Sequence, residues 1–143
     1  MELWKRAISS DAPKWVVLIR FMVGWIFVSE GYLKFHYPMD LGVGLFERLG
    51  VPHPAILAPF VGVVEIVCGA LLILGLLTRL ASIPLLITVA TAIWMTKVPI
   101  IAHYGYWGAM HESRVDFCLL VGLVFLMIVG AGGWSMDRMM SSE

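Results

Sequence analysis

The sequence predicts an all-α membrane protein: a four-transmembrane-helix bundle with a short amphipathic surface helix between helices one and two. The first observation is composition. Hydrophobic residues make up 60% of the 143 residues and charged residues 14%, whereas soluble domains average about 45–50% apolar and about 25% charged. Mean hydropathy is +0.89. The second observation is that the apolar residues form four long runs without the alternation of strands, and a spanning helix needs about 20 such residues.

The four predicted spans cover residues 15–33, 57–77, 80–101 and 115–134, and they belong to one domain, residues 1–143. The first run does not resemble a signal peptide. It contains Arg20 and Glu30 and lacks a small-x-small cleavage site at its end, so we expect it to remain as a helix.

The connection between the first two spans contains a short amphipathic pattern. Glu47 and Arg48 lie on one helical side, and Gly50 and Pro52 end the run. The apolar residues on the other side are Leu41, Leu45, Phe46 and Leu49. This pattern predicts a short helix on the membrane surface. An irregular loop is the alternative, because two glycines weaken the helix.

The orientation follows from the distribution of lysine and arginine. Five basic residues flank the spans on the side of both termini, namely Lys5, Arg6, Lys14, Arg79 and Arg138. Three lie on the opposite side, namely Lys34, Arg48 and Arg114. The positive-inside rule then places both termini in the cytoplasm and the longer loops outside.

Charged residues collect near the outward ends of the predicted spans. Counted along the helices, they are Glu30, Lys34, Glu65, Lys97 and Asp116, whereas Arg20 lies near the inner face. A charge inside a membrane usually faces the bundle and pairs with another charge. We therefore predict that Glu65 pairs with Lys97. The two lysines could instead reach outward to the headgroups, and Asp116 could cap the fourth span in a capping box with Ser113.

Small residues predict close packing at the first two spans. Gly24 and Gly31 share a stripe with Arg20, and Gly62 and Gly69 share one with Glu65. Such stripes let helix backbones approach each other in membranes.

The remaining titratable residues give weaker signals. His36, His53, His103 and His111 lie in the outward loops without the spacing of a metal site, so no metal is predicted. Cys68 and Cys118 lie in apolar helices without a CxxC motif, which favours packing over a redox role.

Two stretches resemble the DoxX family of small four-helix bacterial membrane proteins. They are RFMVGWIFVSEGYLK, with Arg20, Gly24, Phe27, Gly31 and Lys34, and EIVCGALLILGLLTR, with Glu65, Gly69, Gly75 and Arg79. The segment LGVPHP lies between the two stretches and Lys97 follows the second, which is the order of these features in the family. The resemblance covers roughly residues 15–134. The resemblance implies a relation to the DoxD-type subunit of thiosulfate:quinone oxidoreductase. It also implies a multi-pass protein of the bacterial cytoplasmic (inner) membrane.

The resemblance and the charges together suggest a quinone-linked oxidoreductase component with an outer-leaflet polar pocket. Its predicted catalytic residues are Glu65 and Lys97. The predicted quinone- or substrate-binding residues are Arg20, Glu30, Lys34, Tyr104, His111 and Asp116. An aromatic wall could come from Tyr32, Tyr104, Tyr106 and Trp107.

Two other functions are consistent with the same residues. The first is a transporter of a small solute or of protons, with Glu65 as carrier and Arg20 as the inner step. The second is a non-catalytic scaffold subunit whose ion pairs set helix register. No resident cofactor is identified, and a quinone would be the substrate. The expected partners are the lipid bilayer, a redox subunit and further copies of the chain. The net charge of zero gives no basic field for nucleic acid.

Overall fold

The computed structural model describes residues 2–142, and helices are its regular structure, with no strand in that range. In chain order they are α1 (Glu2–Ile8), α2 (Val16–His36), α3 (Val43–Arg48), α4 (Pro54–Leu74), α5 (Thr78–Ala92), the π-helix η1 (Ile93–Lys97), α6 (Val98–Glu112), α7 (Arg114–Val129) and α8 (Met136–Ser141). The all-α prediction and the short helix between the first two spans are both confirmed.

Three helical stretches are long and apolar enough to cross a membrane. They are α2, α4 and the helical stretch Thr78–Glu112, which is interrupted at Gly105. Helix α7 has 16 residues, fewer than the roughly 20 that a hydrocarbon core requires. The fourth span therefore stays a prediction.

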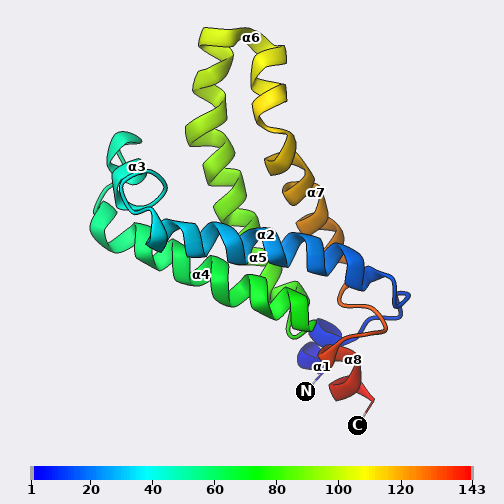
Figure 1. Cartoon of the computed structure of the whole chain (residues 1–143). Coiled ribbons are helices and arrows are strands. Elements are labelled where there is room, and N and C mark those ends of the chain that lie inside the picture. The colour runs from blue at the N-terminus through cyan, green and yellow to red at the C-terminus, as the bar shows by residue number, and fades with distance from the viewer. Residues whose placement is uncertain (1, 143) are drawn as a thin grey trace.

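The predicted loop between residues 101 and 115 is wrong, because most of it is helical. The helix runs on to Glu112, and α7 begins at Arg114. Gly105 breaks the run with φ 72° and ψ 177°, a conformation that only glycine adopts without strain. The chain reverses direction at this end of α6 (Figure 1). One glycine thus replaces a loop, and the residues on both sides of it are helical.

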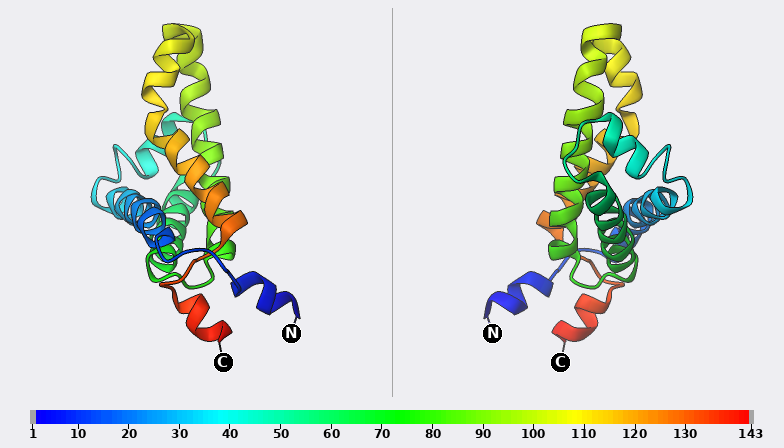
Figure 2. Two further views of the ribbon diagram at one scale, coloured as in Figure 1. Left: turned by 90° about the vertical axis from the view of Figure 1, so that its right-hand side faces the viewer. Right: turned by 90° about the vertical axis from the view of Figure 1, so that its left-hand side faces the viewer.

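The long helices form two pairs that meet near one end of the molecule and diverge toward the other. Helix α2 packs along α4, and α5 packs along α7. Figure 1 shows α6 at the far end of the second pair and α3 at the far end of the first pair. The views of Figure 2 likewise show α6 projecting past the α2–α4 pair.

The core lies where the two pairs cross. Its buried members come from α2, α4, α5 and α7; they are Val16, Val23, Phe27, Leu72, Ala81, Leu85, Val89, Leu119, Leu123 and Leu126. Burying one such side chain contributes about 1.5–3 kcal/mol in water. In lipid this term is largely lost, and dispersion contacts between closely packed side chains carry the association.

Both described ends of the chain lie on the same side. Helices α1 and α8 contact each other and lie at the end opposite α6 (Figure 1). Helix α4 begins with a proline and is followed by Gly75 at φ 70°, as expected for a helix start and a glycine C-cap. The short turn after it brings α5 back alongside α4.

Candidate functional site

Glycine residues bring α2 and α4 into backbone contact at two levels. A methyl group on Gly24 would lie 2.6 Å from the carbonyl oxygen of Gly69, and one on Gly31 would lie 2.6 Å from that of Gly62. In each helix the two glycines are seven residues apart, about two turns. The predicted glycine stripes therefore face each other, as small residues do where membrane helices pack closely.

An ion pair lies at the α3 end of this contact. The ammonium nitrogen of Lys34 is 2.7 Å from Oε2 of Glu65. The side chains are 12% and 5% exposed, respectively. Within the described residues this carboxylate oxygen has no hydrogen-bond donor in addition to the ion pair. Removing the lysine would therefore leave a buried carboxylate without compensation.

The loop after α2 closes over the backbone at Lys34. Gly42 and Gly44 are buried. A methyl group on Gly42 would collide with the carbonyl oxygen of Lys34. Arg48 holds the loop by donating to the carbonyl oxygens of Met39 and Asp40, each at 3.0 Å. The loop thus packs against α2 at the residue that supplies the lysine of the ion pair.

The second ion pair lies in the other pair of helices, between η1, which continues α5, and α7. The ammonium nitrogen of Lys97 lies 3.5 Å from Oδ2 of Asp116, and the two side chains are 23% and 24% exposed. The predicted pairing of Glu65 with Lys97 is therefore wrong. Similar depth in a membrane does not bring two residues together when their helices belong to different pairs.

The predicted capping role of Asp116 is also not observed. Ser113 precedes α7 but makes no side-chain cap. Its hydroxyl donates instead to the carbonyl oxygen of Ala109 at 2.6 Å. Asp116 is free to turn toward Lys97 because the capping box does not form.

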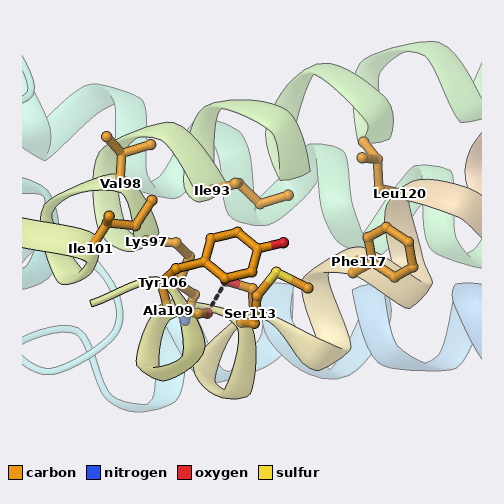
Figure 3. Close-up of a pocket in the computed structure, with 10 residues that line it drawn as sticks. Ile93, Lys97, Val98, Ile101, Tyr106, Ala109, Ser113, Phe117 and Leu120 are labelled. Atoms are coloured by element: carbon orange, nitrogen blue, oxygen red, sulfur yellow. Dashed lines mark hydrogen bonds between the residues drawn. The ribbon is translucent and has the colours of Figure 1, made fainter. Parts of the chain in front are cut away.

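A groove of about 240 Å³ opens beside Lys97, between η1 with the start of α6 on one side and the end of α6 with α7 on the other. Its lining is almost entirely apolar; the residues are Ile93, Lys97, Val98, Ile101, Tyr106, Ala109, Met110, Ser113, Phe117 and Leu120. Figure 3 shows the ring of Tyr106 lying over the groove, with its hydroxyl directed toward the Phe117 side. A half-open apolar groove with one cation at its wall can hold a flat, weakly polar ring.

Four predicted site residues lie outside these two ion pairs. Glu30 is exposed one turn before Lys34. Tyr104 is 78% exposed and His111 is also exposed, and neither lines the groove. Arg20 is 1% exposed and donates to the carbonyl oxygen of Trp134. It therefore lies with the terminal segments, far along α2 from Lys34.

One buried acid was missed because it lies in a short polar tail. Asp137 of α8 is 1% exposed. Its carboxylate accepts from the backbone N–H groups of Leu77 at 2.7 Å and Thr78 at 3.0 Å, and its own N–H donates to Gly75 at 2.9 Å. It thus caps the start of α5 from a distant part of the chain.

The other titratable residues form no site in the described part of the chain. Within residues 2–142, no group of three or more His, Cys, Asp or Glu side chains could hold a metal ion. Cys68 and Cys118 are both free thiols, the first partly buried and the second exposed.

Long apolar helices, facing glycines and ion pairs between helices define an integral membrane protein with several candidate spans. The DoxX family model matches residues 15–98, more than half of the sequence. The chain belongs to the DoxX family. The match includes the Lys34–Glu65 pair and ends just after Lys97. The groove residues from Ile101 to Leu120 therefore lie beyond the matched range.

Three curated proteins are similar over most of their length. The chain is 46% identical to the uncharacterised membrane protein Rv3486 of Mycobacterium tuberculosis, covering 98% of this chain and 90% of that protein. An uncharacterised protein of Haemophilus influenzae is 33% identical, over 88% and 90%. CatD of Bacillus subtilis, whose name proposes an oxidoreductase, is 26% identical, over 85% and 83%. No solved structure matches the chain.

Proposed function

We propose that this protein is a quinone-binding component of a membrane oxidoreductase, and that the groove beside Lys97 receives the quinone ring. The observation that carries the proposal is an apolar groove with Lys97 in its wall, where Lys97 also pairs with Asp116, a residue that does not itself line the groove. Sites for drug-sized ligands measure about 300–1,000 Å³. A groove of about 240 Å³ suits a ring alone, with the isoprenoid tail left in the lipid.

The two charged residues have complementary roles in this proposal. Lys97 donates a hydrogen bond to one quinone carbonyl, and Asp116 exchanges protons with the ring oxygens. Reduction of a quinone to a quinol takes up two electrons and two protons. The electrons come from a partner redox protein or a reduced sulfur compound, and the protons pass through Asp116. General acid–base groups act within about 2.6–3.2 Å of the proton they transfer, so the ion pair must open when the ring binds.

The comparison with CatD supports an oxidoreductase, because that protein's name proposes this activity. CatD is a distant relative, at 26% identity. The Lys34–Glu65 pair, in contrast, is nearly buried, with side chains 12% and 5% exposed, and lines no groove. We assign it to holding the first helix pair together.

Binding of a short-chain menaquinone analogue to the purified protein in nanodiscs tests the proposal. We expect Lys97→Met and Asp116→Asn each to weaken binding at least tenfold, because each removes one partner of the ring oxygens. Thr91→Val is the matched control, since Thr91 is an exposed residue of α5 that does not line the groove. Equal binding by all four proteins would overturn the assignment. Solute uptake in proteoliposomes without analogue binding would favour the transporter instead.

A further inference from the structure

The helix that carries Lys97 changes its hydrogen-bond pattern at that residue. Ile93–Lys97 form a π-helix, and the N–H of Val98 donates to the carbonyl oxygen of Ile93, five residues earlier. Such π-turns are rare and occur frequently at functional sites. The turn lies between α5 and α6, in the helical stretch that begins at Thr78 and is interrupted only later, at Gly105.

Pro99 supplies a physical cause for the turn. Proline has no N–H to offer the carbonyl four residues before it, here that of Met95, and its ring collides with that carbonyl. A wider turn moves the carbonyl away from the ring. The hydroxyl of Thr96 also donates to the carbonyl oxygen of Ala92 at 2.6 Å, a back-bond that tends to bend helices.

Two other prolines inside helices do not produce a π-turn. Pro59 is the sixth residue of α4, and Pro84 is the seventh residue of α5. Both prolines lie in the second turn of their helix. Only one turn precedes each of them, and that turn can tilt away from the proline ring. Pro99 follows a run of more than 20 helical residues, so the collision there has to be absorbed within the helix.

The π-turn keeps three residues on one face of the helix. Ile93, Lys97 and Ile101 all line the groove, although they are spaced by four residues. In an α-helix each four-residue step rotates by about 40° beyond a full turn, so two steps would carry Ile101 about 80° away from Ile93. The wider π-turn takes back part of this rotation.

We propose that Pro99 is a positioning residue, which imposes the π-turn that directs Lys97 toward Asp116 and into the groove. The role in ligand binding rests on the proposed quinone function. The geometric role does not, since the position of Lys97 relative to Asp116 can be measured without any quinone.

Cross-linking tests the geometry. Lys97→Cys and Asp116→Cys are introduced together into a Cys68→Ala, Cys118→Ala background, and the protein in nanodiscs is treated with a short bifunctional thiol reagent. We expect Pro99→Ala to lower the cross-linked fraction several-fold, because an ordinary α-helix turns residue 97 away. Pro84→Ala is the matched control and should leave the fraction unchanged. Equal cross-linking with and without Pro99 would overturn the proposal.

Binding of the menaquinone analogue provides the second readout. We expect Pro99→Ala to weaken binding about as much as Lys97→Met does, and the double variant to lose no more than either single variant. If cross-linking responds to Pro99→Ala but no variant binds the analogue, the positioning role stands and the quinone function fails. If binding falls while cross-linking does not change, Pro99 acts in another way and the positioning role fails.

Discussion

The ammonium group of Lys34 pairs with the carboxylate of Glu65 at 2.7 Å, where two helices are close enough for their backbones to touch. Breaking a buried ion pair by removing one partner costs about 3–5 kcal/mol, because the other charge stays buried alone. Replacing both partners with groups of similar size removes that penalty. The pair therefore predicts strong coupling between the two positions.

A double-mutant cycle measures this coupling. We expect Glu65→Gln and Lys34→Met each to lower the free energy of unfolding in detergent by about 3 kcal/mol, and the double variant to lose clearly less than the sum. Glu65→Gln combined with Lys97→Met is the control. That combination should be additive, because the two residues belong to different ion pairs. Coupling in the control but not in the Lys34 cycle would contradict the structure.

The mistaken partner of Glu65 shows which information a single sequence lacks. Hydropathy and helical rise give the depth of Glu65, Lys34 and Lys97 in a membrane to within about a turn. They do not give which helices are neighbours or how each helix is rotated. The glycine stripes were predictable because a repeat of seven residues marks one face of one helix, whereas pairing depends on contacts between helices.

Asp137 and the helical segment after Pro99 could not be predicted for a related reason. Asp137 lies in a short polar tail, and its burial depends entirely on docking against the turn at Gly75. The segment around Tyr106 contains polar and aromatic residues typical of a loop. It is helical because Gly105 reverses the chain within one residue and α6 then packs against α7.

Substituting Gly31 should separate α2 from α4. A methyl group there would lie 2.6 Å from the carbonyl oxygen of Gly62 and 2.8 Å from Cγ1 of Ile66. We expect Gly31→Ala to destabilise the protein by about 1–3 kcal/mol, as overpacking does elsewhere. Val67→Ala on the exposed face of α4 is the control and should change stability far less. Thermal unfolding in detergent measures both, and equal effects would argue against the close approach.

The cysteines should be dispensable. Both are free thiols, and Cys118 is exposed. We expect Cys68→Ala combined with Cys118→Ala to change the free energy of unfolding by no more than about 1 kcal/mol and to leave binding of the menaquinone analogue intact. Loss of binding in a variant that still folds would assign a redox role to the two thiols.

Asp137 should stabilise the joint between the two helix pairs. It caps α5 with two charge-assisted hydrogen bonds and is 1% exposed. We expect Asp137→Ala to cost about 2–3 kcal/mol, from the lost cap and the unsatisfied N–H groups. Asp137→Asn keeps one acceptor and should lose less. Arg138→Ala, at an exposed neighbour, should have little effect. A similar loss of stability in all three variants would show that the effect does not depend on the Asp137 carboxylate in particular.

The terminal segments should face the cytoplasm. Helices α1 and α8 lie together at one end, so both termini share a side whichever way the chain inserts. The ammonium nitrogen of Lys14 lies 5.1 Å from the ring centre of Trp15 and 5.0 Å from that of Trp134. Tryptophan favours the membrane interface, and cytoplasmic flanks carry the excess of lysine and arginine.

Single cysteines at Lys14 and Pro38, in a background without the native thiols, report the orientation. In intact cells we expect a membrane-impermeant maleimide to label Pro38→Cys, in the loop beyond α2, and not Lys14→Cys. After the cells are opened, both should be labelled, which controls for access to each position. Labelling of Lys14→Cys alone in intact cells would reverse the orientation. The Lys34–Glu65 pair would then lie toward the cytoplasm, and the groove beside Lys97 would open on that side.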